Sequence, residues 1–264
     1  MLRPVRGTVA ANNSDILHWL YTATFLSMLA IVPVFGFLVS RFRRGQFIPA
    51  IYLFFIAHLL LFAAGFDDEA TPVWLQRLFY VWLSVFNLFV VSVFWSFMAD
   101  IFRPGQAQRL FGVIMAGGST GAIIAPSITK AVVPQHGATG VMLVAAAILF
   151  AAMVLAVVLG RYTRRQHHDR PTEVIGGKIW EGAIRVFRSE YLLYACLLML
   201  LHNLTSTFLF NGLAVLVDQN IAGFDERTRF FSHVDQVVQV LAFLLQFFIT
   251  SRLVTLLGMS RTLV

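Results

Sequence analysis

The sequence predicts an all-α protein, a polytopic bundle of transmembrane helices. Hydrophobic residues make up 58% of the chain and charged residues only 12%, a composition far too apolar for a soluble domain. Apolar runs of about 20 residues, long enough to cross a hydrocarbon core of ~30 Å, occur seven times. The connections between these runs alternate between strongly basic and mixed in charge, as the loops of a multi-pass membrane protein do.

The seven predicted spans follow one another with short connections except for one. We place them at residues 17–39, 47–66, 73–99, 110–133, 139–160, 191–217 and 231–251. The connections after the first, third, fifth and seventh spans hold most of the arginines, so the positive-inside rule assigns them to the cytoplasm. The amino terminus is then expected outside and the carboxyl terminus inside. These loops also account for the net charge of +7, so we expect no nucleic-acid partner.

The longest connection, residues 161–190, begins as a polar loop. Its second part, KIWEGAIRVFRSE, places Ile179, Ala183 and Phe187 on one helical face, which predicts a short helix lying on the inner membrane surface. His167 and His168 are adjacent in the loop part and cannot share a helical face. We therefore predict no metal site and no cofactor.

The exits from the first and seventh spans form an internal repeat. Each consists of an apolar run, a Ser-Arg pair at Ser40 or Ser251, and a basic turn with glycine. Six spans separate the two exits, as a transporter built from two parallel six-span halves requires. We accordingly divide the chain into 1–160, the remainder of an amino-terminal half; 161–190, a cytoplasmic linker; and 191–264, the start of a carboxy-terminal half.

The sequence lacks the motifs of a soluble enzyme, and no enzymatic activity is predicted. The GGSTG run does not have the spacing of a dinucleotide-binding loop and lies inside an apolar span. Glycine costs a helix about 1 kcal/mol relative to alanine, but in a bilayer it lets two helices approach closely. Gly117, Gly118 and Gly121 are therefore interpreted as a helix-packing surface, with a substrate-facing role as the alternative.

Polar residues inside the apolar spans are candidates for a solute path, because burying them in lipid is costly. Hydrogen bonding between helices is the alternative for each. The candidates are Asn87 and Trp95 in the third span, Asn203 and Thr207 in the sixth, and Asp235 and Gln239 in the seventh.

The inner loops carry candidate gating residues. Asp100 and Arg109 flank one short cytoplasmic loop, and we expect them to form a charge pair that breaks and reforms between states. Arg41 and Arg252, in the two repeated Ser-Arg exits, are expected to control closure on the same side.

Four short motifs resemble the major facilitator superfamily, and within it the bacterial branch related to ATP/ADP translocases. They are LRPVR at 2–6, FWSFMAD at 94–100, QRLFG at 108–112 and AGGSTGAIIAP at 116–126. The resemblance implies that the seven spans belong to a facilitator-type twelve-helix fold. It also implies that LRPVR lies at the outer end of the first transmembrane helix, so that the chain is truncated at both ends.

The resemblance further implies a role for the two arginines of LRPVR. Arg3 and Arg6 are one helical turn apart and so share a face, where two guanidiniums could hold a phosphate or carboxylate. A basic terminal tail is the alternative. The family's motif normally continues with aspartate, whereas this chain has Gly7, so no acidic function is carried over to that position.

These observations together predict a secondary transporter of a small organic solute that works by alternating access. A nucleotide or another organic anion is the favoured solute. Its expected partners are the lipid bilayer and the solute. We expect it in the cell membrane, which is the inner membrane in a bacterium. The alternatives are a seven-span receptor or sensor, a non-transporting membrane scaffold, and an inactive gene product.

The pairing of Asp100 with Arg109 can be tested by charge reversal. Asp100→Arg and Arg109→Asp should each abolish transport, because each places two like charges at the loop, and the double variant should restore it by re-forming the pair. Transport in vesicles measures the outcome. A double variant as inactive as the single ones would contradict the pairing.

Overall fold

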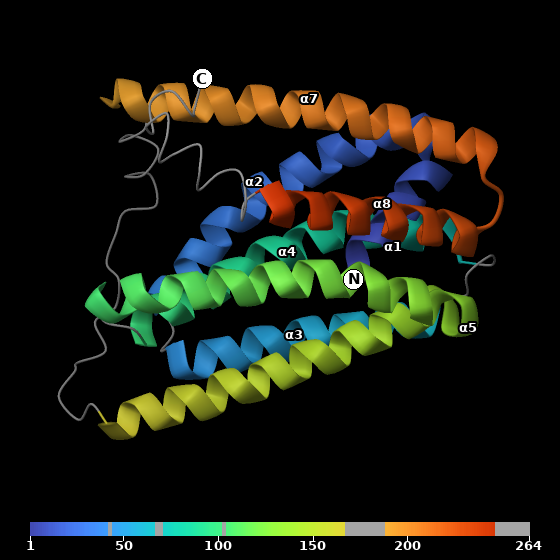
Figure 1. Cartoon of the computed structure of the whole chain (residues 1–264). Coiled ribbons are helices and arrows are strands. Elements are labelled where there is room, and N and C mark those ends of the chain that lie inside the picture. The colour runs from blue at the N-terminus through green and yellow to red at the C-terminus, as the bar shows by residue number, and fades with distance from the viewer. Residues whose placement is uncertain (42–43, 67–70, 102–103, 167–187, 246–264) are drawn as a thin grey trace.

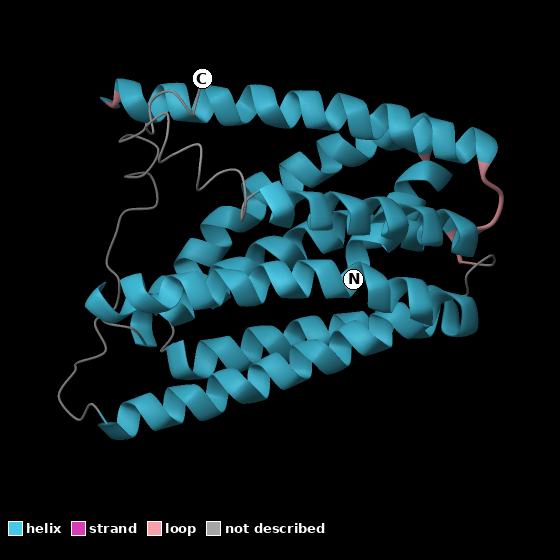
Figure 2. Cartoon of the chain, viewed as in Figure 1, coloured by secondary structure: helices cyan, strands magenta, loops and turns pink. Residues whose placement is uncertain are grey.

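The computed structural model describes residues 1–41, 44–66, 71–101, 104–166 and 188–245, and every regular element in these parts is helical (Figure 2). The helices are α1 (Leu2–Asn12), η1 (Ser14–Ile16), α2 (Leu17–Arg41), α3 (Arg44–Gly65), α4 (Val73–Ile101), α5 (Pro104–Gln166), α7 (Glu190–Asn220) and α8 (Phe224–Leu244). The all-α prediction is confirmed. Five segments are long and apolar enough to cross a membrane: Ser14–Phe37, Phe47–Gly65, Val73–Met98, Ile114–Tyr162 and Glu190–Asn220.

Helix α5 contains two of the predicted spans. At its full length of 63 residues a straight helix would be about 95 Å long, roughly three times the hydrocarbon core. The chain reverses at Gly137, whose φ of 55° and ψ of −157° are non-helical, and the two halves run back along each other (Figure 1). Glycine is required here because this region of backbone space is strained for residues with a Cβ.

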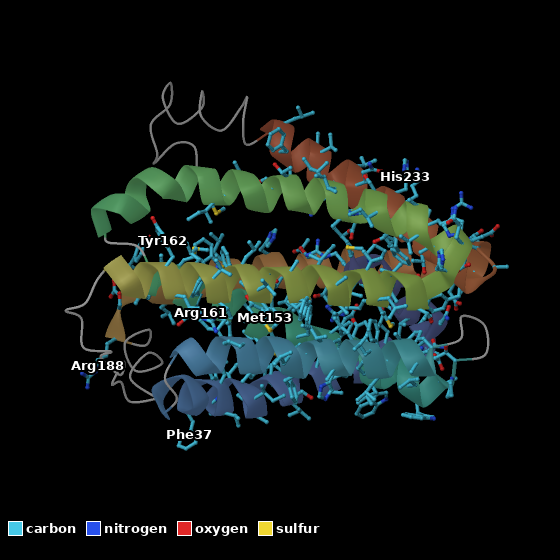
Figure 3. The ribbon with its side chains drawn as sticks, turned by 90° about the horizontal axis from the view of Figure 1, so that it is seen from below. Phe37, Met153, Arg161, Tyr162, Arg188 and His233 are labelled. Carbon is cyan, nitrogen blue, oxygen red and sulfur yellow. The ribbon has the colours of Figure 1, made fainter. Side chains whose placement is uncertain are left out.

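The ends of the helices alternate as the charge pattern predicts. Figure 3 shows Phe37 near the exit of α2, Arg161 near the exit of α5 and Arg188 at the entry to α7, all at one end of the bundle. The turns at Gly137 and between α7 and α8 lie at the opposite end (Figure 1). The described residues that flank two of the connections predicted to be cytoplasmic, those after the first and fifth spans, therefore lie at one end; the connection after the seventh span lies outside the described residues.

Helix α8 starts earlier than the predicted seventh span. It begins at Phe224, and its first turn carries Asp225 and Glu226, where negative charge interacts favourably with the helix dipole. The part of the prediction that covers residues 246–251 lies outside the described residues. The predicted surface helix after residue 178 does so too, except for its last residues, where Ser189 caps α7 by accepting a hydrogen bond from the backbone N–H of Leu192.

Helix α1 is a buried element, not a tail. Its eleven residues pack against α4, α5, α7 and α8, and Val5 and Val9 are completely buried. Two more helices, α3 and α4, pack through edge-to-face aromatic pairs, for example between Phe55 and Phe86, whose ring centroids are 5.3 Å apart. Such pairs favour one fixed arrangement of rings beyond simple burial.

Helix α7 packs only near its carboxyl end. Ala214 and Val217 are buried, whereas every residue from 196 to 209 is exposed. Figure 1 shows α7 running along one side of the bundle, and among the described helices it contacts α1 and η1 most closely. The exposed stretch includes Cys196, the chain's one cysteine.

The approach of α1 to α8 depends on Gly7. A Cβ added at Gly7 would lie 2.8 to 3.0 Å from three ring atoms of Phe231, closer than real Cβ atoms come to other groups. The missing side chain thus creates the space that the Phe231 ring fills.

Gly7→Ala should destabilise the protein by about 1–3 kcal/mol, because the added methyl overpacks the contact with Phe231. Gly212→Ala is the matched control, since a Cβ there meets nothing within 4 Å, and it should be neutral or stabilising by ~0.5–1 kcal/mol. Thermal unfolding in detergent, followed by far-UV circular dichroism, measures both. Equal unfolding midpoints for the two variants would contradict the packing argument.

Candidate functional site

The seam between α1 and α8 is polar as well as tightly packed. The hydroxyls of Thr8 and Thr228 lie 2.7 Å apart and both residues are completely buried. Further along, Gln236 of α8 donates a hydrogen bond of 2.8 Å to the Ser127 hydroxyl of α5. The first contact joins α1 to α8, and the second joins α8 to α5.

Arg6 lies on α1 with its guanidinium carbon 4.2 Å from the centre of the Tyr80 ring. This distance is that of a cation–π contact, which stabilises a desolvated guanidinium. The Nε of Arg6 is buried and has no hydrogen-bond partner among the described residues. The side chain therefore retains one directed donor in the interior of the bundle that a ligand could use.

Arg3 has a different environment. It is exposed, one turn before Arg6, and lies close enough to Asp235 of α8 for a direct electrostatic interaction. Asp235 is half-buried. The structure thus brings together Arg3 and Asp235, two residues that the sequence analysis placed in the solute path for unrelated reasons.

The remaining candidates are placed as follows. Asn87 is exposed on α4 and Gln239 half-buried on α8. Asn203 and Thr207 lie on the exposed part of α7, and their side chains donate to backbone carbonyls one turn earlier, at 2.7 and 2.8 Å. Such bonds satisfy a polar group within its own helix, so the structure does not bring Asn203 and Thr207 to the arginines.

The predicted gating residues keep their roles as predictions. Arg252 and the side chains of Asp100, Arg109 and Arg41 lie outside the described part of the structure.

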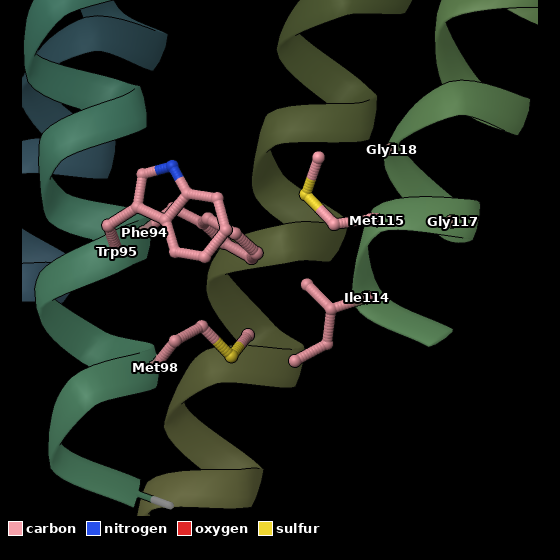
Figure 4. A pocket seen from close by; sticks show the side chains of 7 residues that line it. All are labelled: Phe94, Trp95, Met98, Ile114, Met115, Gly117 and Gly118. Carbon is pink, nitrogen blue, oxygen red and sulfur yellow. The ribbon is translucent and has the colours of Figure 1, made fainter. Parts of the chain in front are cut away.

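Trp95 lines an apolar cleft of about 420 Å³ between α4 and α5 (Figure 4). Its walls are Phe94, Trp95, Met98, Ile114, Met115, Gly117 and Gly118. The cleft offers almost no polar atoms, so it is not suited to bind an anion.

Three glycines in the first half of α5 face open space within the described structure. A Cβ at Gly117, Gly118 or Gly121 would meet no atom within 4 Å. No described helix packs against them, and their predicted role in helix packing stays a prediction. Among the described residues there is also no group of three His, Cys, Asp or Glu side chains that could hold a metal.

The sequence analysis missed a polar cluster at the end of the bundle opposite Arg188. There Arg227 of α8 forms a salt bridge of 2.8 Å with Asp218 of α7 and donates to the side chain of Asn12 at 2.6 Å. The run of polar residues at 12–15, between two helices, was the available signal.

The comparison with known families decides between the functional classes. A family model described as Major Facilitator Superfamily matches residues 8–264. The chain belongs to the major facilitator superfamily. No curated protein and no solved structure matched it.

Membership in the major facilitator superfamily identifies the chain as a secondary membrane transporter, a multi-pass protein of the lipid bilayer that binds a small solute. It favours the predicted transporter over a receptor or a scaffold. The helical bundle and its five candidate membrane spans agree with this fold.

The hydroxyl pair at the α1–α8 seam should contribute modestly to stability. Thr8 and Thr228 each also reach a carbonyl of their own helix, at 3.2 and 2.9 Å, so each hydroxyl keeps an acceptor when its partner is removed. A double-mutant cycle of Thr8→Val and Thr228→Val should give a coupling energy of about 0.6 kcal/mol. Additive effects on the free energy of unfolding in detergent would show that the two hydroxyls do not interact.

Proposed function

We propose that this protein transports an organic anion by alternating access, and that nucleotides are the first class to test. The observation that carries the proposal is Arg6, a cation inside the bundle whose Nε lacks a hydrogen-bond partner. The aromatic face of Tyr80 holds the guanidinium in place. An aromatic ring carries no net charge, so this contact does not neutralise the guanidinium.

The need for a ligand anion follows from the cost of burying charge. An unpaired charged group inside a membrane protein is expensive and usually marks a binding or transport pathway. Carboxylate and phosphate groups match the fork of N–H donors on a guanidinium. A solute carrying either group would complete the hydrogen bonding of Arg6 while it is bound.

The difference between the two arginines supports assigning the main role to Arg6. Arg3 already has a carboxylate nearby, that of Asp235, with which it interacts electrostatically. A pair of this kind, between α1 and α8, would separate when the two halves move apart. We propose that Arg3 then becomes available to a second anionic group of the solute.

Alternating access assigns the halves proposed from sequence, residues 1–160 and 191–264, to two rocking units. The α1–α8 seam lies between these units, and Arg6, Arg3 and Asp235 lie along it. The preference for nucleotides rests on the resemblance of the LRPVR and AGGSTGAIIAP motifs to the ATP/ADP translocase branch. The contacts of Arg6 support organic anions more generally.

The proposal predicts saturable exchange of labelled ATP in liposomes that contain the purified chain. Arg6→Ala should lower the exchange rate at least ~10-fold, because truncating a charge-assisted contact costs about 1.5–3 kcal/mol. Arg6→Lys should lose most of the same rate, since an ammonium cannot replace the directed fork. Arg188→Ala, at the exposed entry to α7, is the matched control and should leave exchange unchanged.

Two results would contradict the proposal at different levels. If other anions such as dicarboxylates exchange and ATP does not, the nucleotide class is wrong while the anion class stands. If neutral solutes are carried and Arg6→Ala transports as well as the parent, the proposed role of Arg6 is wrong.

A further inference from the structure

Arg227 is the centre of the polar cluster at the end of the bundle where α1, η1, α7 and α8 meet. Besides its salt bridge to Asp218, it donates from Nε to the carbonyl of Ile221 at 2.7 Å and from Nη2 to the carbonyl of Asp218 at 3.0 Å. The fourth contact runs from Nη1 to the side-chain oxygen of Asn12 at 2.6 Å. Three of these contacts stay within the α7–α8 unit, and the fourth leaves it.

A second hydrogen bond crosses between the two units at the same place. The hydroxyl of Ser14 in η1 donates to the carboxylate of Asp218 at 2.9 Å. Arg227 thus binds Asn12 at the end of α1, and Asp218 binds Ser14 at the start of η1.

The partners in the first unit are themselves held in position by α4. Asn12 donates to Gln76 at 3.4 Å, and Arg77 donates from Nε to the side-chain oxygen of Asn13 at 2.9 Å. These two bonds connect the end of α1 to the start of α4. The cluster thus joins α1 and α4 of one unit to α7 and α8 of the other.

The distribution of charge makes this junction reversible. The salt bridge between Arg227 and Asp218 lies inside one unit, with side chains 13% and 36% exposed, so it survives when the units separate. Only the neutral partners Asn12 and Ser14 are lost, and water can replace them. Parting the units therefore leaves no uncompensated charge, which is the main cost of breaking a buried ion pair.

The contacts beneath the cluster show what it closes. Thr8 lies one helical turn below Asn12 and is completely buried, and Phe231 lies one turn below Arg227 and packs on Gly7. Away from this end, α7 is exposed from residue 196 to 209. Within the described chain, α7 thus joins the first unit at this end, whereas α8 also packs along α5.

We propose that Arg227 and Asp218 form a latch that holds the solute pathway closed at this end by binding Asn12 and Ser14. Solute entry from this side requires release of those two neutral partners. The inference rests on the alternating access proposed above, but it does not depend on which solute is carried. By the charge of the loops, this end is expected to face outward.

The test measures access to the seam directly, without a substrate. The background is Cys196→Ser with Thr8→Cys, which leaves one thiol beneath the latch. Arg227→Ala and, separately, Asn12→Ala should each speed labelling of that thiol by a membrane-impermeant maleimide at least ~10-fold. Asn12→Ala keeps the salt bridge, so its effect reports the contact between the units.

Arg229→Ala is the matched control, because Arg229 is exposed two residues further along α8 and carries the same charge. It should label at the parent rate. A separate variant with Asn220→Cys, exposed at the same end, establishes which side of the membrane this end faces.

The latch would be refuted if neither Arg227→Ala nor Asn12→Ala changed the labelling rate. It would also be refuted if labelling rose equally from both sides together with a lowered unfolding temperature, because that indicates general loosening. Faster labelling from the Asn220 side alone supports it, even if ATP exchange is absent and the proposed substrate is wrong.

Discussion

The close approach of α1 to α8 is the contact on which the rest of the molecule depends. Membrane helices associate without a hydrophobic driving force between them, so close packing and hydrogen bonds must supply the attraction. At this seam Gly7 admits the ring of Phe231, and one helical step further the Thr8 and Thr228 hydroxyls meet at 2.7 Å. Both the interior arginine and the polar cluster at the end of the bundle are positioned by these few residues.

The cationic groups around this seam are balanced in three different ways. Arg227 is fully engaged by Asp218 and by backbone carbonyls. Arg3 has Asp235 nearby across the seam. Arg6 lies over the Tyr80 ring, and its Nε has no hydrogen-bond partner among the described residues. The anion transport proposed above would use these differences, since a fully neutralised site would not bind an anion and a fully unpaired one would destabilise the empty protein.

The helical architecture could be predicted from sequence because it follows from local properties. Length and apolarity gave α2, α3, α4 and α7 to within a few residues, and the turn at Gly137 fell between two predicted spans. The repeat of Ser-Arg exits and four short motifs pointed to the superfamily that the comparison then established. Local composition was sufficient for each of these.

The site could be predicted only in part, because its geometry joins distant segments. Arg3, Arg6 and Asp235 were found as charges in unexpected places, but nothing local shows that Arg3 and Asp235 are neighbours. Asn203 and Thr207 stand out in an apolar run, yet bond to their own helix on its exposed side. Asn12 and Ser14 were not among the predicted site residues, because their partners Arg227 and Asp218 lie more than 200 residues away in the chain.

The turn at Gly137 also determines how the rest of the chain enters the bilayer. Without this turn, the 63 residues of α5 could not fit across one bilayer. The segments that follow would then lose the starting point that places Arg188 and Arg227 at opposite ends of the bundle.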